Sequence, residues 1–429
     1  MASEPPYDIF RDPIHGFIKV YGVEKDVINS KPFQRLRRIR QLGLTSLVYH
    51  GAEHTRFGHS IGVMNFASKV LDSLWARYRP LFKKRLNWND SKYKVARNKL
   101  RLAALLHDVG HAPFSHAADL FPNTAGKKES HETYGEKIVD QTEISQIIDR
   151  HSKDTDVDKT DVLNLMNKNT LGLENILLRN VFVGDLDADR MDYLLRDSLY
   201  TGVQYGRFDS DRLIEKLGLL ERNDGSLVIA VEESGMHAAE GLLLARYFMF
   251  TQVYFHQIRR IYDIHLTRVI QEALNELTGC REFPKDVEKY LNIDDHTIFS
   301  FIEKKAKEGK LEEATFIQNR TRYRLAEQTG EYAYGEEVDK FEKLSNRLSD
   351  KLGQEFVIKD KSIKAHYNYD YKKGEERLLV MLKNKQTRDI AFMSKVIENL
   401  YEICQYRVYV HPNHYDTAES LVDNWNKRK

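Results

Sequence analysis

Cysteine is almost absent from this 429-residue chain, which contains only Cys280 and Cys404. Neither lies in a Cys-x-x-Cys pattern, so the sequence excludes a disulfide framework and a cysteine zinc site. This usage fits a reducing compartment, and we expect a cytoplasmic protein. Any metal site must therefore be built from histidine, aspartate and glutamate.

Long apolar runs and an excess of one charge are missing as well. No stretch approaches the roughly 18 to 20 apolar residues needed to cross a bilayer, and the first six residues show no secretion signal. We therefore expect no membrane partner. The 66 Lys and Arg residues nearly balance the 64 Asp and Glu residues, which argues against a protein whose main task is to coat nucleic acid.

The chain does contain enough apolar residues, 41%, to bury a sizeable core. A strand, turn and strand are predicted over residues 10–20, and helical spacing dominates from residue 31 to about 280. We predict a mainly α protein. Residues 1–280 form a catalytic lobe that opens with a short β-hairpin, and residues 281–429 form a smaller α+β lobe. The polar residues 144–172 are expected to form a surface excursion with one short helix.

A cluster of histidines follows the apolar helix predicted over residues 95–106. His107 and Asp108 come first, and His111 and His116 lie within the next nine residues. A His-Asp pair alone is more often a core histidine hydrogen-bonded to its neighbour. Three imidazoles beside one carboxylate instead favour a site that binds a cation and moves protons on a phosphate ester.

A second pattern lies near residue 190. Asp189, Tyr193 and Asp197 are spaced by four residues, so they share one face of a helix. Arg190 stands beside them, where a guanidinium can hold phosphate oxygens. Taken alone, this pattern more often means an exposed helix with ordinary ion pairs.

The most basic stretch of the chain is residues 33–43. Phe33, Leu36 and Ile39 predict a buried stripe that leaves the arginines outside. Such a stretch usually forms a solvated helix face, and a face that binds an anion or another subunit is the alternative. His54, which precedes a helix, is expected to be a surface or turn residue rather than a ligand.

Together these segments resemble the HD-domain deoxynucleoside triphosphate triphosphohydrolases. The resemblance covers most of residues 7–280, and it matches only loosely in the C-terminal lobe, near residues 406–410. It implies an HD-domain helical bundle, hydrolysis of a dNTP to a deoxynucleoside and tripolyphosphate, and a homo-oligomer, either dimer or tetramer. The segments that carry it are residues 12–16, 33–43, 56–60, 107–116 and 189–197.

The resemblance also implies roles for single residues. The implied metal ligands are His59, His107, Asp108 and Asp189. The residues implied around the reacting phosphate are His111, His116, Asp119 and His131. The residues implied to contact the nucleotide are Arg56 and Arg190 at the triphosphate and Gln41, Leu42, Tyr193 and Asp197 at the sugar.

Two histidines and two aspartates form a mixed nitrogen and oxygen set that suits Mn²⁺, Mg²⁺, Fe²⁺ or Zn²⁺. Such an ion can polarise a phosphoryl group and lower the pKa of a bound water. A histidine can then donate a proton to the departing 5′ oxygen. We expect His116 to be this acid, with His111 and His131 stabilising charge.

Two positions depart from the mammalian members of the family. Those members read an activating guanine nucleotide with an acidic residue and a lysine, where this chain has Asn29 and Asp8. The changes argue against that form of activation. We still expect that a nucleotide effector could bind at a subunit interface containing residues 35–40. Such a site would select a different nucleotide.

Two other functions fit the same residues. One is an HD-type phosphodiesterase acting on cyclic nucleotides or short oligonucleotides, with His131 at a second metal. The other is a nucleotide-sensing binding protein, which would need neither metal ligands nor proton-transfer histidines.

Overall fold

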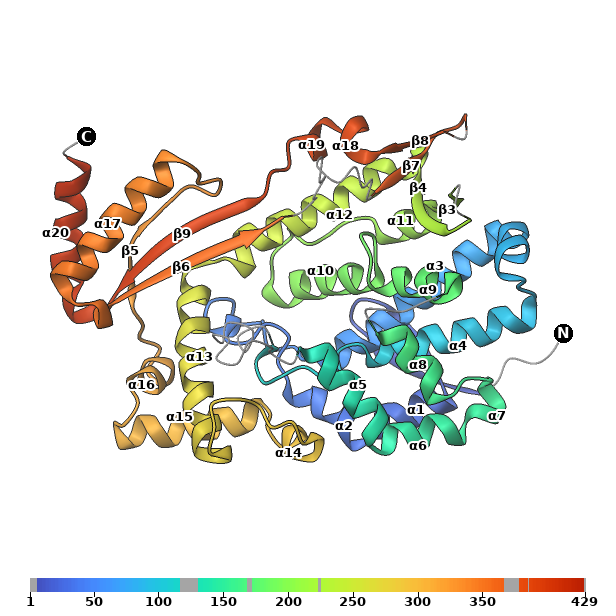
Figure 1. Cartoon of the computed structure of the whole chain (residues 1–429), viewed down its shortest axis with the longest axis horizontal. Coiled ribbons are helices and arrows are strands. Elements are labelled where there is room, and N and C mark those ends of the chain that lie inside the picture. The colour runs from blue at the N-terminus through green and yellow to red at the C-terminus, as the bar shows by residue number, and fades with distance from the viewer. Residues whose placement is uncertain are drawn as a thin grey trace.

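The computed structural model describes residues 6–115, 130–167, 172–222, 225–365, 378–384 and 386–427. Helices dominate, as Figure 1 shows, and they confirm the predicted mainly α class with a smaller α+β part. The predicted catalytic residues His116 and Asp119 lie outside the described residues. None of the helices in the described ranges is long and apolar enough to span a membrane.

The longer helices up to residue 278 are α1 (Gly22–Asn29), α3 (Arg56–Leu86), α4 (Asp90–Leu106), α5 (His131–Gln141), α6 (Glu143–Arg150), α8 (Lys159–Met166), α9 (Leu173–Phe182), α10 (Ala188–Thr201), α11 (Ser210–Lys216), α12 (Met236–Met249) and α13 (Gln257–Thr278). Single turns occur at α2 (Lys31–Gln34) and α7 (Ser152–Thr155). After residue 280 the helices are α14 (Val287–Leu291), α15 (Asp295–Glu308), α16 (Glu312–Gln318), α17 (Glu336–Leu352), α18 (Ile390–Met393), α19 (Lys395–Glu398) and α20 (Tyr415–Asn426).

The strands form three small sheets. The predicted hairpin is present as β1 (Tyr7–Asp12) paired antiparallel with β2 (Gly16–Tyr21). A four-stranded sheet has the order β3 (Leu217–Glu221), β4 (Leu227–Glu232), β7 (Leu379–Met381) and β8 (Thr387–Asp389). A three-stranded sheet has the order β5 (Arg324–Gln328), β9 (Ile403–Val410) and β6 (Val357–Lys364).

Helices α3, α4 and α10 form the part of the core that positions the site. The last turn of α4 is buried on all sides, from Leu102 to Leu106, so the helix delivers the residues that follow it into the interior. Gly62 of α3 permits the close approach of α10. A Cβ atom at this position would lie 1.9 Å from the Asp192 carboxylate, so a larger residue would push the two helices apart.

The expectation of a surface excursion at residues 144–172 was wrong. The described part of this range contains most of α6, together with α7 and α8, and its apolar side chains belong to the main core. Ile144, Ile147 and Ile148 recur at three and four residue steps, so they form one buried face of α6 on an otherwise polar helix. The high overall polarity hid this short stripe.

The basic stretch 33–43 also differs in part from its prediction. Phe33, Leu36 and Ile39 are buried as expected, but Arg35 is buried with them rather than solvated. Its guanidinium donates hydrogen bonds to the carbonyl oxygens of His111 and Ile293, at 2.8 and 2.7 Å. Backbone carbonyls therefore replace water at its two terminal nitrogens, whereas its buried Nε atom has no hydrogen-bond partner among the described residues.

The C-terminal part contacts the elements that precede residue 280 at two places. β7 pairs in parallel with β4, and its Val380 joins the main core. β6 and β9 run from α17 and α20 across to α12 (Figure 1). An ion pair between Arg260 of α13 and Asp360 of β6, and a 2.7 Å hydrogen bond from Arg407 to the Phe255 carbonyl, attach this sheet beside the site. The predicted division at residue 280 stays a prediction.

Candidate metal centre and active site

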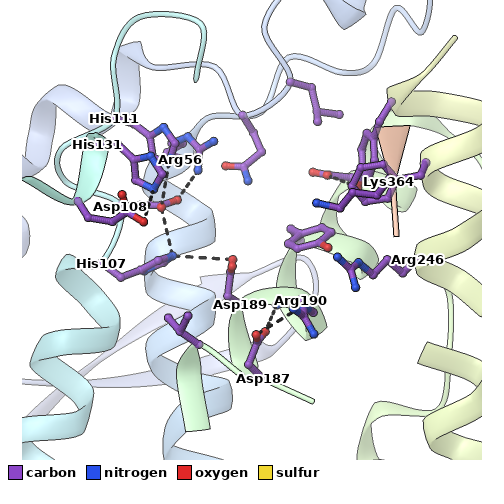
Figure 2. A pocket seen from close by; sticks show the side chains of 18 of the residues that line it. Arg56, His107, Asp108, His111, His131, Asp187, Asp189, Arg190, Arg246 and Lys364 are labelled. Atoms are coloured by element: carbon purple, nitrogen blue, oxygen red, sulfur yellow. Dashed lines mark hydrogen bonds and ion pairs between the residues drawn. The ribbon is translucent and has the colours of Figure 1, made fainter. Parts of the chain in front are cut away.

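The four predicted metal ligands lie together. The Nε2 atom of His59 lies 3.0 Å from an Asp189 oxygen and 3.5 Å from an Asp108 oxygen. The Nε2 atom of His107 lies 3.3 Å from Asp108 and 3.8 Å from Asp189. Three elements meet here, because His59 belongs to α3, His107 and Asp108 follow α4, and Asp189 opens α10. Figure 2 shows His107, Asp108 and Asp189 facing one another.

Both histidines are oriented through their other ring nitrogen. The Nδ1 atom of His107 lies 2.8 Å from the Ala104 carbonyl oxygen, and the Nδ1 atom of His59 lies 2.9 Å from Asp192. These contacts direct the two Nε2 atoms toward the carboxylates. The buried Nε2 atom of His107 has no hydrogen-bond partner among the described residues. A divalent cation would satisfy this nitrogen, so the donor set fits a metal ion.

Asp192 is fully buried and connects several charged groups. Arg196 donates two hydrogen bonds to its carboxylate, at 2.8 and 2.9 Å, and His15 lies 2.8 Å away on the other side. Burial alone would raise the pKa of Asp192, but Arg196 and the two histidines outweigh it and hold the pKa well below its usual range. The carboxylate stays ionised and fixes the ring of His59.

The negative charge gathered around His59 raises the pKa of its imidazole. Burial disfavours the charged imidazole, yet hydrogen bonds with Asp189 and Asp192 and the charges of nearby carboxylates outweigh burial. Together they raise the pKa of His59 to about 10. The same carboxylates would stabilise a bound metal ion, because the ion supplies the positive charge that the protonated imidazole otherwise supplies.

A second group lies beside the first. Asp108, His111 and His131 also bring their ligand atoms within 4.8 Å of one another. The rings of His111 and His131 stack with centroids 4.1 Å apart, and the Nε2 atom of His111 lies 3.2 Å from Asp108. Gly110 permits this approach, because a Cβ atom there would lie 2.1 Å from the carbonyl oxygen of His131.

Arg56 contacts two residues of the segment that follows α4, Asp108 and Ser115. Its guanidinium forms an ion pair with Asp108 and donates a 2.7 Å hydrogen bond to the Ser115 hydroxyl. Burial lowers the pKa of His111, and the positive charge of Arg56 lowers it further. His111 is therefore a neutral imidazole beside a guanidinium and a carboxylate.

The predicted sugar-binding residues form another wall. Both oxygens of Asp197 are used, since Tyr254 donates a 2.7 Å hydrogen bond to one and His54 Nε2 lies 2.7 Å from the other. His54 is therefore buried, so the expectation of a surface position was wrong, although His54 does lie in the loop that precedes α3. Gln41 lies near them, and its buried Oε1 atom has no hydrogen-bond partner among the described residues. Leu42 and Tyr193 line the same space.

Residues of both groups and of the Asp197 wall line one cavity of about 500 Å³, whereas His59, His54 and Asp192 are not among its lining residues in the described part of the chain. Figure 2 shows Arg246 and Lys364 across the cavity from the His-Asp groups, and Arg190 beside Asp189 and Asp187. Arg190 is held by Asp187, which caps the start of α10 by accepting from the Arg190 backbone N–H at 2.6 Å. The cavity thus has a metal-binding end and a cationic wall, an arrangement suited to a polyphosphate.

Comparison with known proteins agrees with this geometry. A family model described as the HD domain matches residues 56–195, and one described as the HD associated region matches residues 208–422. The chain belongs to the HD-domain family. An uncharacterized protein of Bacillus subtilis is 31% identical to this HD-domain chain over 91% of it and 89% of the relative.

Solved structures and curated relatives of this HD-domain protein support a hydrolase. A hypothetical protein from Aquifex aeolicus has a TM-score of 0.78 and 32% identity, over 97% of this chain and 100% of that chain. A phosphohydrolase from Bacteroides thetaiotaomicron has a TM-score of 0.71 and 26% identity, over 95% and 100%. The deoxynucleoside triphosphate triphosphohydrolase SAMHD1 homolog of Dictyostelium discoideum is 29% identical over 76% of this chain and 61% of its own length.

Sequence reasoning missed four residues of the HD-domain site. Arg246 interrupts the apolar stretch of α12, which is a signal that could have been noticed. Tyr254 belongs to a π-helical turn, Phe250–Tyr254, that has no clear sequence signature. Lys364 ends strand β6, far along the chain from the other site residues, and Asp192 resembled an ordinary helix carboxylate.

Proposed function

We propose that this HD-domain protein is a metal-dependent dNTP triphosphohydrolase that releases a deoxynucleoside and tripolyphosphate. One observation carries the proposal: four proposed metal-ligand side chains converge beside a cavity whose wall also bears Arg190 and Arg246. A triphosphate ester carries several negative charges along its length, so it can contact both a bound metal ion and these arginines. The Dictyostelium discoideum relative, which is named a deoxynucleoside triphosphate triphosphohydrolase, supports the same substrate class.

We infer that His59, His107, Asp108 and Asp189 hold one divalent ion, either Mn²⁺, Mg²⁺, Fe²⁺ or Zn²⁺. When bound, the ion would polarise a phosphoryl group and lower the pKa of a water. The protein's own contribution is positional. Arg56 keeps Asp108 ionised, and the neutral His111, stacked on His131, can stabilise charge at the reacting phosphate. His116 stays our predicted acid.

The other end of the substrate would be held by the wall around Asp197. Its carboxylate, fixed by Tyr254 and His54, can accept a further hydrogen bond from a sugar hydroxyl. Gln41 offers a buried oxygen as a second acceptor. Tyr193 supplies an aromatic surface beside Tyr254, with ring centroids 6.4 Å apart.

A second candidate function is an HD-type phosphodiesterase. The group formed by Asp108, His111 and His131 favours it, because the same three side chains could hold a second metal ion next to the first. A dinuclear site would suit the cleavage of cyclic nucleotides or short oligonucleotides. Homo-oligomerisation and a nucleotide effector at a subunit interface stay predictions under either function.

Product analysis separates these functions. The protein is incubated with each dNTP, and separately with cyclic nucleotides, in Mn²⁺ or Mg²⁺, and the phosphorus products are identified by ³¹P NMR. Tripolyphosphate supports the dNTP triphosphohydrolase, and a nucleoside monophosphate from a cyclic nucleotide supports the phosphodiesterase. Nucleotide retention without turnover in any metal would instead indicate a nucleotide-sensing binding protein.

A further inference from the structure

The cationic wall of the cavity includes a side chain from the C-terminal lobe. Lys364 is the last residue of β6, yet it lines the same cavity as His107, Asp108 and Asp189. Figure 2 shows it beside Arg246, across from the His-Asp groups. A residue far from His107 in the sequence thus faces the proposed reaction centre.

The fold fixes Lys364 in this place. Along β6, Ile358, Asp360 and Ser362 are buried, whereas Lys359, Lys361 and Ile363 are exposed, so alternate residues face the catalytic helices. Lys364 continues the inward-facing series. The ion pair of Asp360 with Arg260, whose nitrogens lie 3.1 Å or less from the carboxylate, attaches the same strand to α13.

The surroundings of Lys364 are cationic and aromatic. Its Nζ atom lies 4.9 Å from the ring centroid of Phe250, and the Arg246 guanidinium lies 5.8 Å from the same centroid. No carboxylate of the described residues lies within ion-pairing distance of Lys364. Burial lowers the pKa of Lys364 to about 8, and the charges of Arg246 and Arg190 contribute to the shift. An anion bound in the cavity would compensate the half-buried charge of Lys364.

We propose that Lys364 is a substrate-binding residue through which the C-terminal lobe completes a subsite for the distal phosphates of a polyphosphate chain. The inference rests on the proposed function, because it assigns the distal part of a triphosphate to this wall. Arg190 and Arg246 approach the chain from the catalytic helices, and Lys364 approaches it from the opposite lobe. Substrate binding therefore depends on both lobes.

Three variants test the subsite. Lys364→Gln removes the charge, Lys364→Arg keeps it, and Lys361→Gln removes the same charge from the exposed face of the same strand. Binding of inorganic tripolyphosphate is measured by titration calorimetry at fixed Mg²⁺, and kcat and KM are measured with a dNTP. Circular dichroism and thermal unfolding check that each variant is folded.

We expect Lys364→Gln to weaken tripolyphosphate binding by roughly tenfold to a hundredfold, the usual effect of losing a charge-assisted hydrogen bond. The KM for the dNTP rises by a similar factor while kcat changes less, because the lost contact is made before and during reaction. Lys364→Arg and Lys361→Gln stay close to the wild type.

Unchanged tripolyphosphate affinity in Lys364→Gln overturns the inference, and so does an equal loss in Lys361→Gln. Failure of the wild-type protein to bind tripolyphosphate overturns it as well. The proposed function can fail separately from the subsite. If the wild-type protein binds tripolyphosphate through Lys364 but releases none from any dNTP, the anion subsite is supported and the triphosphohydrolase function is refuted.

Discussion

Substitution of Asp192 by asparagine tests whether the metal centre depends on a residue that does not touch the metal. The asparagine side chain would keep the size of the native one but lose the charge that holds His59 through its Nδ1 atom, 2.9 Å away. Loss of a group that orients a metal-bound histidine lowers metal affinity by roughly 10- to 100-fold. That factor corresponds to about 1.4 to 2.7 kcal/mol of binding free energy.

The same substitution also affects folding. Arg196 would lose a buried carboxylate to which it donates two hydrogen bonds, and removal of one partner from a buried ion pair costs about 3 to 5 kcal/mol. Asp12, whose oxygen lies 3.1 Å from Arg196, remains as a partner and keeps the cost near the lower end of this range. Denaturant unfolding measures this free energy directly.

A matched control is available within the chain. Glu24 forms a buried ion pair with Arg101 in the helical core, and it takes no part in the site. Both Glu24→Gln and Asp192→Asn are dialysed against buffers of fixed free Mn²⁺, and bound metal is counted by mass spectrometry. We expect both to lose stability and only Asp192→Asn to lose metal affinity. Wild-type metal affinity in Asp192→Asn would refute the orienting role.

Three further predictions follow from single contacts. His107→Ala removes a proposed ligand, so the folded protein loses turnover and bound metal, and undiminished activity would exclude the metal centre. Tyr254→Phe removes a hydroxyl that holds the sugar-side carboxylate, and raises the KM for dNTP by roughly five- to tenfold, whereas Tyr49→Phe, outside the cavity, does not. Gly110→Ala places a Cβ atom 2.1 Å from a carbonyl oxygen and lowers the free energy of unfolding by about 1 to 3 kcal/mol. Gly241→Ala, whose Cβ meets only an ordinary 3.6 Å contact, leaves it unchanged or higher, and an equal loss there would contradict the packing argument.

The sequence was most informative where residues with unusual chemistry stand close together. His107 and Asp108 at the end of an apolar helix indicated a buried polar site, and the structure brings them beside His59 and Asp189. Local spacing assigned these residues to three separate helices or helix ends. Only the resemblance to a family indicated that the three segments lie together. The mainly α class followed from helical periodicity, and the N-terminal hairpin followed from the turn residues Pro13 and Gly16.

What could not be predicted depends on long-range packing. Arg35 is buried because two carbonyl oxygens happen to face it, and no local pattern records such partners. His54 is buried for a similar reason, since its partner Asp197 lies 143 positions away. Lys364 reaches the cavity only because β6 is attached to α13 from another lobe. From their charge and polarity alone, these residues would be predicted to lie at the surface.

The parallel pairing of β7 with β4 has a consequence for how the polypeptide matures. Val231 is opposite Val380, so the apolar surface beside the early helices is closed by a strand that emerges late from the ribosome. Ile390 and Ile397 join the same core immediately afterwards. A nascent chain that stopped at residue 280 would carry an uncovered strand edge and be prone to self-association. The enzyme is therefore completed only when its last segments are made.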